Sequence, residues 1–239
     1  MSRNHLTRLT RFVRADRLSL NVLILVALCQ HQFVVASDQD GQSPQSQPKP
    51  STSAWKPLFD GKTLDGWKVV HFGGDGEVEV ADGCIHMDFG AMLTGITYQK
   101  DFPVTDYEIR LEAKRVDGID FFCGLTFPVG KSHCSLIVGG WAGAVVGLSS
   151  IDDRDASEND TTKYMNFEDG RWYRIRVRVT RDRIQAWIDD KPMVNQDIRN
   201  RKVSTRAEVD LNKPLGIAAW QTRAALRKIE YRRLAQGTP

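Results

Sequence analysis

The sequence predicts an all-β fold, a sandwich or barrel of short antiparallel strands, on two observations. First, apolar and charged residues alternate in "YEIRLEAKRV" (107–116) and "RWYRIRVRVT" (171–180), which is the pattern of strands with one buried and one solvated face. Second, turn residues recur at close spacing, and a sustained helical period is missing except for one turn within 199–208.

Individual strands follow from local signals along the chain. "EVEVADGCIHM" (77–87) predicts a hairpin that turns at Ala81–Gly83. "DFFCGLTFPVGKSHCSLIV" (120–138) predicts a second hairpin with its turn at Pro128–Lys131. The last strands are expected in "RIQAWIDDKPMV" (183–194), with a turn at Asp189–Lys191, in "LGIAAWQ" (215–221) and in "LRKIEYRRL" (226–234).

The stretch "LIVGGWAGAVVGL" (136–148) differs from the other strands because it is apolar on both faces and contains four glycines. Glycine inside a strand often marks a bulge or a place where something approaches the backbone closely. Here that would be a ligand or the opposite sheet. Burial in the centre of a sheet explains the same composition equally well.

The first 36 residues have the features of a secretory signal peptide. "MSRNHLTRLTRFVRADR" carries five Arg and one Asp, and the apolar run "LSLNVLILVAL" that follows is too short to span a bilayer comfortably. Val34 and Ala36 are placed as the small residues before a cleavage site. We therefore expect residues 1–36 to be removed and the mature protein to be secreted or periplasmic, without a membrane span. An uncleaved membrane anchor is the alternative.

Removal of this segment leaves a linker and one domain. Residues 37–54 contain Ser, Gln and Pro but no large apolar residue, which predicts a disordered linker, and residues 55–239 are expected to form one folded domain. The full chain has a net charge of +3, but residues 37–239 hold 28 bases against 29 acids. This balance predicts no nucleic-acid partner.

Three cysteines remain after cleavage, Cys84, Cys123 and Cys134, in a compartment that permits disulfides. A turn centred between Pro128 and Val129 would place Cys123 directly opposite Cys134, at a separation that a disulfide can bridge. Two free, buried thiols are the other interpretation, and the sequence favours neither.

The acidic stretch "SSIDDRDASENDTTKY" (149–164) follows the apolar run directly. Burial of its carboxylates would be costly, so the stretch is expected at the rim of the concave sheet face. Asp153, Asp155 and Glu158 offer hard oxygen ligands for Ca²⁺ or Mg²⁺, although their spacing does not match a helix–loop–helix calcium loop. A merely solvated turn is the alternative.

Five stretches of the chain resemble, in order, the 3-keto-disaccharide hydrolase domain family. The opening "WKPLFDGKTLDGWKV" (55–69) and the block "DGRWYRIRVRVTRDRIQAWIDDKPMV" (169–194) are the specific ones. "EVADGCIHM", "LTGITYQKDFPVTDYEIRLEAKRV" and "LGIAAWQTRAALRKIEYRRL" continue the likeness, which spans nearly all of 55–234. Two stretches depart from the family pattern, since "DGIDFFCGLTF" has Cys and Gly after the paired Phe and "GIAAWQTR" contains no His.

The resemblance implies a concanavalin A-like jelly roll of two antiparallel sheets in an exported bacterial protein. It also implies hydrolysis of 3-keto-glycosides. The ketone acidifies the neighbouring C2–H, elimination then breaks the C1–O bond, and hydration completes a net hydrolysis. Such a reaction needs a base at C2, an acid near the glycosidic oxygen, and a metal or a basic side chain that holds the enolate charge.

Several residues are candidates for this chemistry. Asp152 and Asp153 lie nearest the strand end, and His71 and His133 are the candidate histidine bases, although each histidine is also explained as a surface residue. Sugar rings pack against flat aromatic faces, and residues Asp152–Asp160 are expected within reach of Trp141 or Trp220. The expected substrate-binding residues are Trp141, Trp220, Gln221 and Arg223.

Two functions follow from these observations. The likeness over nearly the whole domain favours an exported hydrolase, with Ca²⁺ or Mg²⁺ as the expected cofactor. The scarcity of histidine and the departures from the family pattern favour a non-catalytic carbohydrate-binding or interaction domain on the same fold. In both cases a carbohydrate is the expected ligand.

Overall fold

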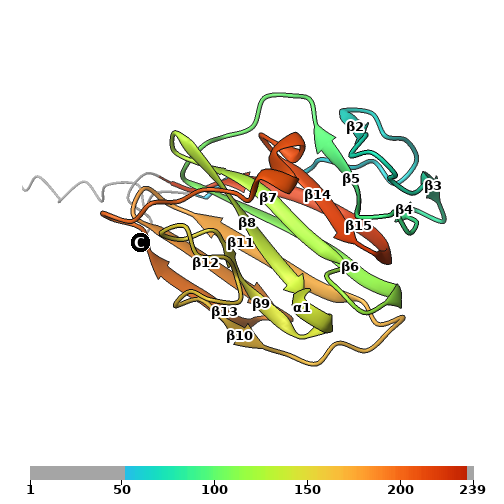
Figure 1. Ribbon diagram of the computed structural model, residues 1–239. Helices are drawn as coiled ribbons and strands as arrows, with labels where there is room; N and C mark the ends of the chain where they lie inside the picture. The colour runs from blue at the N-terminus through green and yellow to red at the C-terminus, as the bar shows by residue number, and fades with distance from the viewer. Residues whose placement is uncertain (1–51, 236–239) are drawn as a thin grey trace, which may run out of the picture. The chain divides into compact units, whose positions relative to one another are not determined.

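The computed structural model describes residues 52–235, which form two antiparallel β-sheets packed face to face (Figure 1). The predicted all-β fold, a jelly roll of two antiparallel sheets, is confirmed. The signal peptide expected at 1–36 and most of the linker expected at 37–54 lie outside the described residues. Within 52–235, none of the helices has the length and apolar character that crossing a membrane requires.

The first sheet has eight strands in the order β13-β12-β11-β6-β15-β4-β3, with β1 paired to β15. Its centre is formed by β6 and β15, the two longest strands of the described chain. The strands are β1 (Lys56–Pro57), β3 (Val78–Ala81), β4 (Cys84–Met87), β6 (Tyr107–Gly118), β11 (Tyr173–Val179), β12 (Arg183–Ile188), β13 (Lys191–Asp197) and β15 (Thr222–Arg233).

The second sheet has seven strands in the order β10-β9-β8-β7-β14-β5-β2. Two short helical elements, α1 (Gly140–Gly143) and η1 (Ala207–Asn212), lie against it. The strands are β2 (Trp67–Val70), β5 (Leu93–Tyr98), β7 (Cys123–Val129), β8 (Ser132–Gly139), β9 (Val145–Ser149), β10 (Lys163–Tyr164) and β14 (Gly216–Trp220).

The core between the sheets follows the predicted alternation. Tyr107, Ile109 and Leu111 of β6 are at most 2% exposed and pack in one large apolar cluster with the inward residues of both sheets. Burial of such side chains is the main source of stability in a sandwich of this kind. The exception is Glu108, which lies on the outward side of β6 and is nevertheless fully buried.

The expectation that Cys123 lies directly opposite Cys134 on the neighbouring strand is wrong. The β7–β8 hairpin turns at Gly130–Lys131, where Gly130 has a φ of +59°, and not between Pro128 and Val129. A turn centre two residues further along shifts the register by four residues, so that Cys123 faces Val138 and Cys134 faces Phe127. Four residues correspond to roughly 13 Å along a strand, which a disulfide cannot bridge.

Both thiols are instead free and buried in the core, and Cys84 is also free and buried. Burial raises the pKa of Cys123 to about 12, and burial likewise raises the pKa of Cys134 to about 12. These cysteines therefore pack as small apolar side chains and are not activated thiols.

The apolar stretch 136–148 forms two strands and not one. β8 and β9 are joined by α1, where Gly139, Trp141, Ala142 and Gly143 all have positive φ values between 49° and 97°. The glycines of the stretch 136–148 allow segments of the chain to pack closely together. A Cβ on Gly147 would lie 2.8 Å from the carbonyl oxygen of Ala156, so this glycine makes room for the acidic loop that folds over β9.

Candidate functional site

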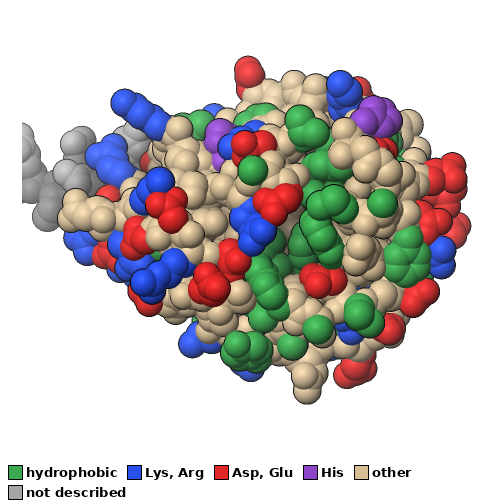
Figure 2. Space-filling model, viewed as in Figure 1, with side chains coloured by type: hydrophobic (Ala, Val, Ile, Leu, Met, Phe, Trp, Pro, Cys, Tyr) green, Lys and Arg blue, Asp and Glu red, His purple; other side chains and the backbone are tan. Residues whose placement is uncertain are grey.

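A cavity of about 240 Å³ lies on the outer face of the seven-stranded sheet. In the same view as Figure 1, the space-filling picture shows hydrophobic side chains gathered over the centre of this face, with charged side chains beside them (Figure 2). The lining comes from β5, β8, β9, β14, α1, η1 and their connections: Leu93, Asp120, Phe121, Ser135, Ile137, Trp141, Ser149, Arg206, Glu208, Val209 and Trp220.

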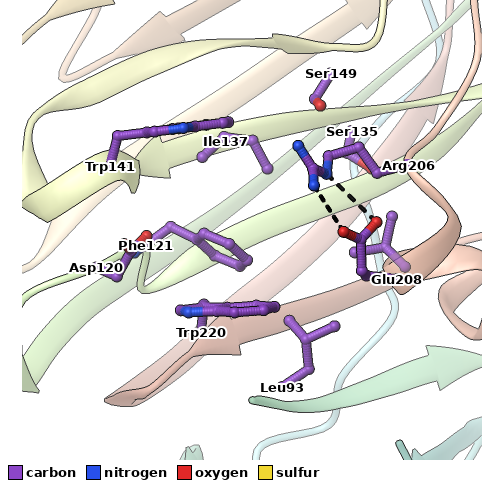
Figure 3. Close-up of a pocket in the computed structure, with 11 residues that line it drawn as sticks. Leu93, Asp120, Phe121, Ser135, Ile137, Trp141, Ser149, Arg206, Glu208 and Trp220 are labelled. Carbon is purple, nitrogen blue, oxygen red and sulfur yellow. Dashed lines mark hydrogen bonds and ion pairs between the residues drawn. The ribbon is translucent and has the colours of Figure 1, made fainter. Parts of the chain in front are cut away.

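Two tryptophans form opposite walls of the cavity. Figure 3 shows the indole rings of Trp141 and Trp220 lying roughly parallel across it, with Phe121 between them. Trp141 is 40% exposed although it is a large aromatic residue, and it sits in α1 at a φ of 49°, a conformation that L-residues rarely adopt. Strained backbone of this kind is concentrated at functional sites, where it holds a side chain in one position.

Asp120 holds the backbone beside two of the aromatic residues, Phe121 and Trp141. Its Oδ1 accepts the backbone N–H of Phe121 at 2.7 Å, and its Oδ2 accepts a longer hydrogen bond from the N–H of Ala142 at 3.4 Å. The carboxylate therefore connects the loop between β6 and β7 to the turn that carries Trp141. The backbone N–H of Trp220 in turn donates to the carbonyl of Phe121 at 3.0 Å.

Phe121 lies flat on the sheet because β7 has a glycine beneath it. A Cβ on Gly124 would be 2.9 Å from Cε2 of the Phe121 ring. The ring also packs 6.4 Å from the ring of Trp220, centroid to centroid, so Gly124 fixes the depth of the cavity through Phe121.

We expect Gly124→Ala to push the Phe121 ring into the cavity. The atom that must move is the far end of a side chain, so the change in unfolding free energy is expected to stay below about 1 kcal/mol. Affinity for the expected carbohydrate ligand, measured by quenching of tryptophan fluorescence, is expected to fall several-fold because the Phe121 ring fills part of the cavity. An unchanged affinity would show that Phe121 does not border the ligand.

An ion pair closes the third side of the cavity. Nη2 of Arg206 donates to Oε1 of Glu208 at 2.7 Å, and Nη1 of the same guanidinium donates to Oδ2 of Asp155 at 2.9 Å. The hydrogen bond from Arg206 lowers the pKa of Glu208, and the partner Glu208 raises the pKa of Arg206. Glu208 is therefore an ionised carboxylate in contact with a permanent cation at neutral pH.

The floor of the cavity carries hydroxyl groups. Ser135 of β8 and Ser149 of β9 are each 1% exposed and face one another across the strand pair. The Ser135 hydroxyl is hydrogen-bonded to Thr126 Oγ1 at 2.8 Å. Aromatic walls, a polar floor and a charged end are the features of sites that hold a small polar ring.

Comparison with protein families identifies the domain. The family model for a 3-keto-alpha-glucoside-1,2-lyase-like domain matches residues 54–234. The chain belongs to this family. The resemblance seen in the sequence is thereby confirmed, and the cavity lies within the matched residues. No curated protein matches the chain.

Solved structures confirm the concanavalin A-like type of fold. The exoplasmic/lumenal domain of VIP36 in its Ca²⁺/Man3GlcNAc-bound form has a TM-score of 0.53 and 11% identity, covering 78% of this chain and 93% of that one. The apo Crh5 transglycosylase has a TM-score of 0.50 and 12% identity, covering 80% and 86%.

Among the described acids of this loop in the lyase-like domain, Asp155 alone pairs with a charged residue of the cavity lining. Asp155 touches Arg206, which lines the cavity. Asp152 accepts hydrogen bonds from the backbone and side chain of the segment 201–202, and Asp153 pairs with the Lys202 ammonium at 2.7 Å. Neither of these two aspartates lines the cavity, which corrects their expected position beside the tryptophans.

The expected set of metal ligands is not assembled. Asp153 pairs with Lys202 and Asp155 with Arg206, and within residues 52–235 no three His, Cys, Asp or Glu side chains come together to hold a metal ion. Basic residues of the segment 201–206 instead pair with four aspartates of the loop: Asp152, Asp153, Asp155 and Asp160. The gathering of acids in this loop is therefore explained by ion pairs within the domain.

The two candidate histidines lie outside the cavity of the lyase-like domain. His71 is hydrogen-bonded to Asp75 and strongly exposed, and His133 lies near the β7–β8 turn, where burial lowers its pKa. Gln221 and Arg223 lie next to Trp220 in sequence but hold the loop that precedes β5. Gln221 donates to the carbonyl of Ala91, and Arg223 pairs with Asp88. Of the expected substrate-binding residues, Trp141 and Trp220 line the cavity.

Sequence patterns identify only Trp141 and Trp220 among the eleven lining residues, and the nine others include Asp120, Phe121, Arg206 and Glu208. The stretch "DGIDFFCGLTF" was noted as a departure from the family pattern, and it contains the first two of them. Arg206 and Glu208 flank the start of η1, close to the only helical signal in the sequence. Their approach to Trp141 depends on the folding of a loop far along the chain, which local patterns do not predict.

Proposed function

We propose that this domain is an enzyme that cleaves 3-keto-glycosides in the cavity between Trp141 and Trp220. Membership of the lyase-like family supports the substrate class. The observation that carries the proposal is the Arg206–Glu208 ion pair, which places an ionised carboxylate and a cation beside two aromatic walls. A cavity of about 240 Å³ suits a single sugar ring, with the leaving group extending into solvent.

Glu208 is the proposed base in this reaction. Its carboxylate takes the proton from C2 of the keto sugar, and the electrons of that bond form the enolate of the neighbouring ketone. The enolate then collapses, the C1–O bond breaks, and a C1=C2 double bond forms as the leaving oxygen takes a proton from water. The hydroxide left by that water adds to C1, Glu208 returns its proton to C2, and the sum of these steps is a net hydrolysis.

Arg206 is the proposed group that holds the enolate charge. The guanidinium has five N–H donors, of which three are used by Glu208 and Asp155. Two remain for the oxygen at C3, where negative charge develops in the transition state. Asp155 anchors the guanidinium from the far side, and Asp120 is a positioning residue that fixes the aromatic wall.

The proposal is tested by incubating the purified protein with a nitrophenyl 3-keto-α-glucoside. Release of nitrophenol above the uncatalysed rate is expected, and the corresponding glucoside, which lacks the ketone, is expected to stay intact because its C2–H is not acidified. Parallel reactions with a chelator test the expected Ca²⁺ or Mg²⁺. Equal cleavage of both glycosides would indicate an ordinary glycosidase. Cleavage of neither glycoside would rule out the proposed reaction.

A non-catalytic carbohydrate-binding domain is the second candidate. It is favoured by the position of His71 and His133 outside the cavity and by the pairing of Glu208 with Arg206. The same assay distinguishes the two functions, because a binding domain would quench tryptophan fluorescence on addition of the sugar without releasing nitrophenol. In either case we propose that the protein acts outside the cytoplasm after removal of residues 1–36.

A further inference from the structure

Small polar residues form a row across the outer face of the seven-stranded sheet. The strand register places Ser149 of β9 opposite Ser135 of β8, and Ser135 opposite Thr126 of β7. All three are at most 1% exposed. The row runs beneath the cavity, and both serines line it.

The members of this row differ in their hydrogen bonds. Thr126 and Ser135 satisfy each other at 2.8 Å. The Ser149 hydroxyl oxygen is buried and has no hydrogen-bond partner in the described part of the chain. A buried hydroxyl without a partner is costly, and native proteins leave few of them.

Ser149 differs from the other residues with unpartnered buried polar atoms because it lines the cavity. Among the described residues, Thr105, Gln185 and Asn212 also have buried side-chain atoms without partners, but none of these three lines the cavity. Figure 3 shows the Ser149 hydroxyl on the side of the cavity where the Arg206 guanidinium lies. The unsatisfied hydroxyl therefore stands beside the charged end of the proposed site.

We infer that Ser149 Oγ hydrogen-bonds a hydroxyl of the sugar ring held in the cavity, which makes Ser149 a specificity-determining residue. A serine hydroxyl both donates and accepts, as a sugar hydroxyl does, so one contact satisfies both groups. A site built to hydrogen-bond a hydroxyl rejects analogues that lack it, because its own polar group is then left unpaired. The inference rests on the proposed carbohydrate ligand.

The stability of the ligand-free protein gives the first test. Ser149→Ala removes a hydroxyl that has no partner, so the melting temperature is expected to stay unchanged or to rise. Ser135→Ala is the matched control on the neighbouring strand. It leaves Thr126 Oγ1 unpaired, and the melting temperature is expected to fall by about 2–4 °C. An equal fall in both variants would mean that Ser149 is satisfied within the protein, and would overturn the inference.

Deoxygenated ligands give the second test. Nitrophenyl 3-keto-α-glucoside and its 4-deoxy and 6-deoxy analogues are compared on the wild type and on Ser149→Ala. For the parent sugar, Ser149→Ala is expected to raise KM about tenfold and to change kcat little. Loss of the hydroxyl that Ser149 contacts is expected to weaken binding to the wild type by a similar factor and to have no further effect on the variant.

The outcomes separate this inference from the proposed function. Turnover by the wild type with additive effects of Ser149→Ala and both deoxygenations would remove the inference and leave the enzyme proposal standing. Absence of both turnover and binding in the wild type would remove the proposed function and the inference with it. Coupling between Ser149→Ala and one deoxygenation would support the inference and identify the hydroxyl.

Discussion

Glu208→Gln is expected to lower kcat on a 3-keto-α-glucoside by at least about 100-fold, because the proposed base loses its ability to accept the C2 proton. KM is expected to change much less, since the amide keeps the shape of the side chain. The pKa of Glu208 lies below its ordinary value of 4.5 owing to Arg206, so the base stays ionised through neutral pH. Wild-type activity is therefore expected to fall only in acid, as pH drops through that lowered pKa.

The matched control is Glu230→Gln. Glu230 also pairs with an arginine, Arg110, at 2.7 Å, but it lies on the eight-stranded sheet and does not line the cavity. This variant is expected to keep the wild-type kcat and KM. If Glu208→Gln retained full turnover, the base would have to be another group. Asp120 would be the remaining carboxylate in the cavity lining.

The fold was predictable from the sequence because its signals are local. The alternation in 107–116 and 171–180 and the turn residues at 81–83 and 189–191 each specify a strand or a hairpin without reference to the rest of the chain. The failure at the β7–β8 hairpin has the same origin. Pro128 and Gly130 both signal a turn, and the choice between them decided whether two cysteines would meet.

The aromatic walls of the site were predictable from the sequence, but its charged residues were not, because the site is assembled from distant segments. Trp141 and Trp220 are predictable as sugar-binding residues because they are aromatic residues beside glycines and polar residues, and both line the cavity. Arg206 reaches the same cavity because residues 201–206 are held beside the acidic loop by ion pairs with Asp152, Asp153 and Asp155. Asp153 and Asp155, two of the acids that suggest a metal site in the sequence, thus help to position the arginine that lines the cavity.

The largest loss of stability is expected on the opposite face, from Glu108→Gln. Glu108 lies on the outer side of β6 with no exposed side-chain surface, beneath the guanidinium groups of three arginines, Arg176, Arg178 and Arg232. Trp55 stacks against Arg232 and Trp187 against Arg176, so the rings and arginine stems seal the carboxylate from water. Removal of its charge leaves three cations crowded together without their shared partner.

Breaking a buried ion pair on one side typically costs about 3–5 kcal/mol, and we expect about 3 kcal/mol here because the arginines keep some contact with water. Denaturant unfolding at pH 7 measures this loss. Glu112→Gln is the control, since Glu112 pairs with Arg227 and Lys228 on the same face but is 15% exposed, and its loss is expected to be smaller. Equal losses in the two variants would contradict the importance of burial.

The pH dependence of the Glu108 contribution gives an independent check. Burial alone would raise the pKa of Glu108, but the hydrogen bonds from Arg178 and Arg232 outweigh it, and the pKa lies below its ordinary value of 4.5. A carboxyl whose pKa is lowered by folding stabilises the protein above its unfolded pKa and loses that contribution as pH falls through the folded pKa. The stability difference between wild type and Glu108→Gln should therefore be full at pH 7 and shrink below about pH 4. A difference that stayed constant down to pH 3 would mean that packing of the side chain, and not its charge, supports this face of the sheet.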